Sequence, residues 1–418
     1  MISHPYLVRV DYKLTLPRIF APTRRMQAPP TVLSQVTDTL FRAEFSRCVQ
    51  KFPTMRPTRN FSEYEHFLAL CFAQLTYRES LRDIVACLKS KGSALYHLGF
   101  RGRLSRSNLA YANRHRDWRM FQAVAEVLMR RAARLYQDCV SDPELPTVAF
   151  ALDSSLIALS LNLFSWGSYN RFKRALKLHL MLSLQGKMPA WAAITEGRYP
   201  DMKILEKIPI FPGAYYVMDR GYLDFVRLFH MHTAGGFFVV RNKKRVRFRV
   251  LESREVDKSS GLRCDQTIQL TSDWSRKSYP EPLRRIGLYD AAKKLTLVLL
   301  TNQFDLPATL IAELYRNRWQ VELFFKWIKQ HLRIRSFYGR SENAVRCQIW
   351  SAICAYLMVA ITRKQLNIGK SLNEILQIVS VSIFEQVPLK ELLGTTQVPE
   401  CQKTFEDENR NLLLFKDL

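Results

Sequence analysis

The sequence has 418 residues, 47% of them hydrophobic and 24% charged, and its 63 basic and 37 acidic residues give a net charge of +26. This apolar content is typical of a folded protein and excludes a largely disordered chain, while the length allows two or three domains. The positive charge favours a polyanionic partner, most simply nucleic acid. A membrane surface is the second interpretation, and a merely basic soluble protein is the third.

The apolar run IWSAICAYLMVAI at 349–361 is too short for a membrane-spanning helix, which needs about 20 residues. We therefore expect a buried helix and no membrane partner. The eight cysteines contain no CxxC pair and no cluster with histidines, which argues against a zinc site and favours a reducing compartment. No signal peptide is recognised, so a cytoplasmic location is expected.

The chain begins with an arm, residues 1–30, that lacks clear periodicity, and Met26 is an alternative start. From 31 to 145 apolar residues recur at three- and four-residue spacing, which predicts helices. Serines suited to cap these helices are Ser62 and either Ser105 or Ser107.

The last of these helical segments is strongly basic. It follows the run RGRLSR and carries Arg106, Arg114 and Arg116. Hydroxyls and free backbone N–H groups near a helix start are able to contact phosphate, so residues 31–145 are a candidate DNA-binding domain. A solvated basic face on a structural helix is the alternative.

Strand-like runs begin after DPELPT, and helical stretches lie between them. The strand-like runs are 148–161, 175–184, 190–197, 214–219 and 236–241, and the helical stretches are 201–208 and 222–232. The chain then stays strand-like and polar from 242 to about 304. A long helix begins at Asp305 and Pro307, and the chain is helical beyond 340. This order predicts a mixed α/β fold with helices packed on a sheet.

Three carboxylates occupy positions that favour a metal site. Asp153 ends the strand-like run VAFALD, Asp219 ends AYYVMD, and Glu322 lies on the predicted helix YRNRWQVELFFKWIK. A carboxylate in an apolar run is costly to bury alone. Three carboxylates that converge suit Mg²⁺ or Mn²⁺, and two such ions support phosphodiester cleavage or transfer. Individually, the aspartates are also compatible with turns or caps, and Glu322 with a salt-bridged helix surface.

The polar stripe of this helix contains Tyr315, Arg318, Glu322, Lys326 and Lys329 on one face. Four of these residues form the pattern Y-x2-R-x3-E-x6-K, which resembles the signature of IS4-family bacterial transposases. The runs DSS at 153–155 and DRGY at 219–222 are similar to the two aspartate blocks of that family.

The resemblance implies a function and a fold. It implies an RNase H-like (retroviral-integrase-type) catalytic core with Asp153, Asp219 and Glu322 as catalytic metal ligands for two Mg²⁺ or Mn²⁺ ions. It also implies cut-and-paste transposition by a homodimer. The substrate would be double-stranded DNA, namely the terminal inverted repeats of an insertion sequence and the target. The implied location is the bacterial cytoplasm, at the nucleoid.

DNA contacts are implied as well. Tyr315, Arg318 and Lys329 would contact phosphates near the scissile bond, together with Lys326. Arg241, at the end of the run FFVVR, takes the place of a further DNA-contacting arginine.

The expected organisation has five parts, and the function has two alternatives. The parts are the arm 1–30, a helical DNA-binding domain 31–145, the RNase H-like core 146–241 and 305–340, a β-rich insertion 242–304 and a helical C-terminal region 341–418. A stand-alone nuclease of the same fold and a catalytically silent or domesticated DNA-binding protein are the alternatives.

Overall fold

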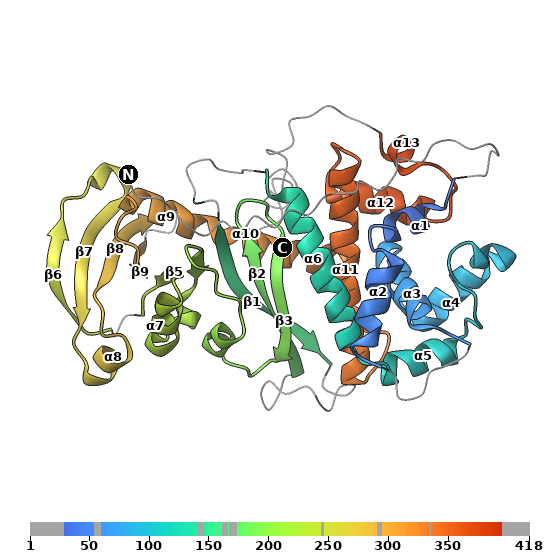
Figure 1. Ribbon diagram of the computed structural model, residues 1–418, viewed down its shortest axis with the longest axis horizontal. Helices are drawn as coiled ribbons and strands as arrows, with labels where there is room; N and C mark the ends of the chain where they lie inside the picture. Colours follow the sequence, from blue (N-terminus) through green and yellow to red (C-terminus); the bar gives the residue numbers. More distant parts are fainter. Residues whose placement is uncertain are drawn as a thin grey trace.

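The computed structural model describes residues 29–53, 60–139, 146, 148–160, 166, 174–243, 246–290, 295–334 and 336–394. Met26, most of the expected N-terminal arm and the last 24 residues of the expected C-terminal region lie outside this part of the chain. The described residues form a mixed α/β structure with one large sheet (Figure 1).

The N-terminal part is helical, as predicted. The elements are α1 (Val32–Thr37), α2 (Arg42–Gln50), α3 (Glu63–Leu75), α4 (Leu81–Lys89), the 3-10 turn η1 (Gly92–Tyr96), α5 (Arg106–His115) and α6 (Arg119–Tyr136). Ser62 caps α3 and Ser105 caps α5, each by accepting a backbone N–H bond. Ser107 lies inside α5, so the cap is Ser105.

Nine strands form a single sheet in the order β3-β2-β1-β4-β5-β9-β8-β7-β6. The strands are β1 (Ala149–Leu159), β2 (Arg174–Ser183), β3 (Pro189–Glu196), β4 (Tyr215–Met218), β5 (Phe237–Arg241), β6 (Phe248–Arg254), β7 (Leu262–Leu270), β8 (Leu283–Asp290) and β9 (Leu295–Thr301). Only the pairs β1–β4 and β4–β5 are parallel, while the other six are antiparallel.

Short helical elements connect the strands. They are η2 (Asp201–Glu206), η3 (Arg220–Tyr222), α7 (Phe225–Thr233), η4 (Lys258–Ser260) and α8 (Asp273–Ser278). The polar stretch 242–304 supplies β6 to β9, and β9 pairs with β5, so these four strands extend the sheet formed by the first five. In Figure 1 they lie at the end of the molecule opposite the N-terminal helices.

Helices α9 (Ala308–Asn317) and α10 (Trp319–His331) replace the single long helix expected after Pro307. Arg318 lies between them and keeps a right-handed helical conformation. The backbone bonds around it, from Arg318 N to Tyr315 O and from Val321 N to Arg318 O, both 3.2 Å, span three residues. The helix therefore tightens at Arg318 rather than ending there.

The C-terminal elements are α11 (Glu342–Gln365), α12 (Leu372–Ser382) and α13 (Leu389–Leu393). Within the described residues, α11 is the one helix long and apolar enough to cross a membrane by length and composition. Its most apolar window is, however, entirely buried inside the protein. The predicted burial of 349–361 is confirmed, and Figure 1 shows α11 beside α6 in the interior.

The sheet separates two apolar cores, because alternate side chains of a strand point to opposite faces. Ala149 and Ala151 of β1 pack in the core that contains α10 and α11. Phe150 and Leu152 pack in a second core with η2 and α7. This alternation decides which polar side chains of the strands can reach α9 and α10.

Candidate active site

Two aspartates and an arginine lie side by side across the centre of the sheet. In the parallel register Leu152 of β1 pairs with Met218 of β4, and Met218 pairs with Val240 of β5. The next residues along the chain are Asp153 in β1, Asp219 directly after β4 and Arg241 in β5, so a polar residue follows each of the paired apolar ones. Adjacent strands are about 4.8 Å apart, and Arg241 Nη1 lies 3.8 Å from Asp219 Oδ1.

These residues continue the face of the sheet that α9 and α10 cover. Asp153 follows Ala149 and Ala151 at two-residue spacing, and Asp219 follows Tyr215 and Val217 in the same way. The four apolar residues all belong to the core on the α10 side. The strand period alone therefore directs both carboxylates towards the helix that carries Glu322.

The polar stripe of α9 and α10 meets the carboxylates through Tyr315 and Arg318. Tyr315 Oη donates to Asp219 Oδ1 at 3.3 Å. Arg318 Nη1 donates to Asp153 Oδ2 at 3.4 Å, and its Nη2 donates to Glu322 Oε1. One guanidinium thus bridges a carboxylate from β1 and a carboxylate from α10, which brings the sequence-predicted residues into one site.

Burial of the apolar side of α10 holds this stripe in place. Val321, Phe324, Phe325, Ile328 and Leu332 are all buried, as the sequence predicts for the face that anchors the helix. Anchoring by these side chains limits rotation of the helix about its axis, so the opposite stripe keeps its orientation towards the strand ends.

The two lysines of the stripe differ in their surroundings. Lys329 Nζ donates to Ser155 Oγ at 2.6 Å, and Ser155 shares the face of Asp153 because it follows two residues later on β1. Lys326 is exposed and points to no partner among the described residues. The contact between Lys329 and Ser155 was not predicted from the sequence.

The surroundings of Asp153 disfavour its ionised form. Burial raises the pKa of Asp153 to about 6, and the negative charges of Glu322 and Asp219 add to this increase. The Arg318 guanidinium and the backbone N–H of Ser154 act in the opposite direction. Burial likewise raises the pKa of Tyr315 to about 12. The Asp153 carboxylate thus lies close enough to Glu322 and Asp219 to interact with them, and Arg318 does not fully offset its burial.

The carboxylate oxygens of Asp153, Asp219 and Glu322 are hard donors of the kind that Mg²⁺ and Mn²⁺ prefer. In the described part of the chain, no three acidic, histidine or cysteine side chains lie close enough together to hold a metal ion as they stand. Arg318 instead occupies the space between Asp153 and Glu322. The donor chemistry fits a divalent cation, and the observed arrangement is an arginine-bridged form of the site.

A second polar network lies on the opposite face of β1. Ser154 Oγ donates to Asp201 Oδ1 at 2.7 Å, and Lys177 Nζ lies 3.1 Å from the same atom. His179 is 3.9 Å from this carboxylate, and burial lowers the pKa of His179 to about 4. This network was not predicted from the sequence, although the alternation of a strand already places Ser154 opposite Asp153 and Ser155.

The basic residues of α5 separate into two groups. Arg106 and Arg114 are exposed, which is compatible with the predicted DNA contact. Arg116 is only 2% exposed, and its guanidinium donates to the carbonyls of Ser62 and Phe61. The expectation that Arg116 contacts DNA is therefore wrong, because its donors hold the N-terminal turn of α3 inside the protein.

Two family models match the chain. Residues 144–358 match the model described as Transposase DDE domain, which is about half of the sequence and contains the three carboxylates. Residues 29–101 match a domain of unknown function (DUF4372).

Three curated relatives are similar to this chain. A putative transposase y4zB of Sinorhizobium fredii is 35% identical over 56% of this chain and 66% of the relative. A probable transposase for insertion sequence element IS5377 of Geobacillus stearothermophilus is 30% identical over 53% of this chain and 59% of the relative. A putative transposase for insertion sequence element IS4SA of Synechocystis is 23% identical over 67% and 78%. The matched segment thus spans under two thirds of the first two relatives.

Among solved structures, the piggyBac transposase synaptic complex with hairpin DNA aligns with 94% of this chain and 87% of that chain. The sequence identity is 12% and the TM-score is 0.44, and no conclusion about the fold or function of this protein is based on this alignment. The family model and the curated relatives are sufficient to confirm the family-level resemblance: the chain belongs to the Transposase DDE domain family.

Proposed function

We propose that this protein is a transposase that cleaves DNA and transfers strands at the terminal inverted repeats of an insertion sequence, with a divalent metal ion as cofactor. The observation that carries the proposal is the Arg318 bridge. It brings Asp153 of β1 and Glu322 of α10 together next to Asp219. A site of this composition serves phosphodiester chemistry.

The core of this enzyme is RNase H-like. The strand order β3-β2-β1-β4-β5, with β2 antiparallel to its neighbours and β1, β4 and β5 parallel, supports this assignment. In this organisation residues 146–241 and 305–340 form the core and 242–304 a β-rich insertion. The helical segment 31–145 binds DNA, and the segment from 341 is a helical C-terminal region.

Asp153, Asp219 and Glu322 would hold the metal ions, two per active site. When bound, the ions would activate the attacking water or 3′-OH and stabilise the leaving oxygen. For the carboxylates to serve as ligands, Arg318 has to leave the space between Asp153 and Glu322. Its guanidinium is then free to contact a DNA phosphate, a role for which arginine is well suited.

The remaining cations of the site bind the substrate backbone. Lys326 is exposed beside the site, and Lys329 and Arg241 lie on either side of the carboxylates. Together with Tyr315 and Arg318 they form the surface for the transposon end, and Arg106 and Arg114 of α5 contribute more distant phosphate contacts. A homodimer would pair the two ends.

The test is cleavage of a plasmid that carries the inverted repeats flanking the gene. Wild-type protein with Mg²⁺ should release the element and join a precut end to target DNA, whereas Asp153→Asn and Glu322→Gln should bind the ends without cleaving them. Cleavage by Glu322→Gln at the wild-type rate would exclude the site assignment. Cleavage without joining would indicate the stand-alone nuclease, and binding without any Mg²⁺-dependent product would indicate a silent DNA-binding protein.

A further inference from the structure

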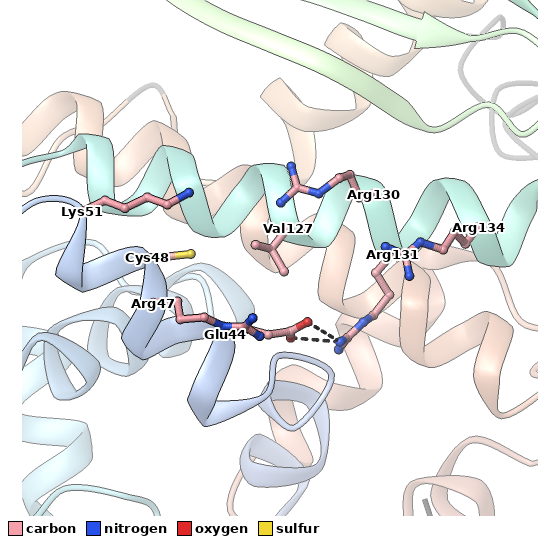
Figure 2. Close-up of a pocket in the computed structure, with 8 residues that line it drawn as sticks. All are labelled: Glu44, Arg47, Cys48, Lys51, Val127, Arg130, Arg131 and Arg134. Carbon is pink, nitrogen blue, oxygen red and sulfur yellow. Dashed lines mark hydrogen bonds and ion pairs between the residues drawn. The ribbon is translucent and has the colours of Figure 1, made fainter. Parts of the chain in front are cut away.

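A basic groove lies between α2 and α6, on the helical part of the protein (Figure 2). Its volume is about 280 Å³. One of its lining residues is acidic, Glu44, and five are basic: Arg47, Lys51, Arg130, Arg131 and Arg134. The groove lies in the helical segment 31–145 that is proposed to bind DNA, but the DNA contacts named above, on α5 and at the carboxylates, include none of its lining residues.

The basic side chains form two rows. Arg47 and Lys51 are four residues apart at the C-terminal end of α2, and Arg130 and Arg134 are four residues apart on α6. Residues at this spacing share a helix face, and all four are exposed. Each wall of the groove therefore presents a pair of cations along its length.

Arg131 has a different, structural role. It donates two hydrogen bonds to Glu44, at 3.0 and 2.9 Å, and one to the carbonyl of Thr39. Its guanidinium lies over the ring of Phe41 at 4.4 Å. Figure 2 shows this ion pair joining the two helices, so it fixes the width of the groove and neutralises its one lining carboxylate.

The other four cations, Arg47, Lys51, Arg130 and Arg134, have no hydrogen bond or ion pair to any residue that the structure describes. Like charges at four-residue spacing on a helix repel each other, and here two such pairs face one groove. A bound anion would relieve this repulsion. Two rows on opposite walls match an extended chain of phosphates better than a single small anion, because every cation then finds an oxygen partner.

We propose that the groove between α2 and α6 binds the phosphodiester backbone of DNA through Arg47, Lys51, Arg130 and Arg134. The inference deepens the proposed function, since the DNA is the substrate of that reaction. The match to the domain of unknown function includes α2, and neither matched family region includes α6, so neither description assigns this groove. Phosphate contacts of this kind position DNA without reading its sequence.

Two double variants of the full chain test the groove, Arg47→Gln with Lys51→Gln and Arg130→Gln with Arg134→Gln. The control is Arg276→Gln with Lys277→Gln, which removes two exposed cations from α8, outside the helical segment that is proposed to bind DNA. Binding to a linear duplex of mixed sequence is measured over a range of salt concentrations. The slope of log K against log [salt] is negative, and each groove variant should reduce its magnitude by about 1.8, since each phosphate contact contributes about 0.9. The control should leave the slope unchanged.

An equal change in slope for control and groove variants would overturn the proposal, because the effect would then follow net charge alone. Acylation of lysines is a second measurement that needs no substitution. DNA should protect Lys51 and not Lys277. Protection of Lys51 by inorganic triphosphate or by anionic lipid vesicles, without protection by DNA, would assign the groove to another ligand and would also overturn the proposal.

The proposed DNA binding by the groove and the proposed reaction can be refuted independently of each other. Groove-dependent binding by a protein that shows no Mg²⁺-dependent cleavage would support the groove and refute the reaction. Mg²⁺-dependent cleavage by a protein whose groove variants bind DNA with the wild-type salt slope would support the reaction and refute the groove. Equal thermal unfolding of all variants confirms that the substitutions leave the fold intact.

Discussion

Replacement of Asp153 by asparagine is expected to stabilise the metal-free protein while it abolishes cleavage. Burial raises the pKa of this carboxyl to about 6, from an ordinary value of 3.8. The folded protein at pH 8 therefore holds a carboxylate where a neutral group would be favoured. Asparagine has nearly the same shape and no charge, so it removes this unfavourable ionisation.

The magnitude follows from the shift in pKa. The difference of about 2 units corresponds to about 3 kcal/mol, at about 1.4 kcal/mol per unit, as an upper value for a side chain that is 22% exposed. Because the folded-state pKa is the higher one, the folded protein binds more protons than the unfolded chain between pH 3.8 and about 6. Wild-type stability falls as the pH rises through this window, so the gain from asparagine appears there and is complete above it.

Urea unfolding of wild type and Asp153→Asn in EDTA, at a series of pH values, measures this effect. The exposed Glu281→Gln variant is the control for the loss of one negative charge and should show no such gain. Added Mg²⁺ should stabilise wild type and not Asp153→Asn, because only the folded wild type retains all three ligands. A variant less stable than wild type at pH 8, or a gain independent of pH, would refute the reasoning.

Three further variants test other contacts. Arg116→Ala should lower the free energy of unfolding by about 3 kcal/mol, since buried carbonyls and the Glu63 carboxylate lose their donor. Urea unfolding measures this change, and a free energy of unfolding equal to that of wild type would contradict the structural role of Arg116. Arg284→Ala should lower the free energy of unfolding by about 3–5 kcal/mol by leaving Asp265 buried without its closest partner. An apolar replacement of both residues should recover the part of this loss that comes from the unpaired Asp265 charge, in the same assay. Ser154→Ala should cost about 1 kcal/mol and slow Mg²⁺-dependent cleavage, and cleavage at the wild-type rate would exclude a positioning role for its bond to η2.

Local sequence patterns were sufficient for most of the secondary structure. The runs predicted as strands at 148–161, 175–184, 190–197, 214–219 and 236–241 coincide with β1 to β5, except that β2 and β3 each begin one residue earlier than predicted. Within 242–304 the sequence predicted strand-like character, but it did not identify β8 or α8. The pairing of β9 with β5 joins segments far apart in the chain, and such a contact has no local signal.

The position of Arg116 shows why exposure was harder to predict. Arg114 and Arg116 are two residues apart in a basic segment, and the composition of the segment predicts the same exposure for both. Residues two apart on a helix do not share a face, and here α5 ends at His115, so Arg116 turns inward to the backbone of Phe61 and Ser62. Burial of an arginine depends on acceptors that another helix supplies.

The arrangement of the carboxylates was largely predictable from the sequence, because the strand and helix periodicities determine which side chains share a face. The two-residue period of β1 and β4 puts Asp153 and Asp219 on one face, and the helical period puts Arg318 and Glu322 on one stripe. Tertiary structure decided the partners: Arg318 bridges Asp153 and Glu322, and Lys329 binds Ser155. The contacts of Arg318 with Asp153 and of Lys329 with Ser155 join residues more than a hundred positions apart, so they depend on how the helix packs against the sheet.

The groove between α2 and α6 illustrates the same division. Each pair of cations is visible in the sequence at four-residue spacing, in RCVQK at 47–51 and in RRAAR at 130–134. That both pairs line one groove is decided only by the packing of α2 against α6, which the ion pair between Glu44 and Arg131 secures. Spacing along the chain sets which side chains share a helix face, whereas packing between distant helices sets which faces meet.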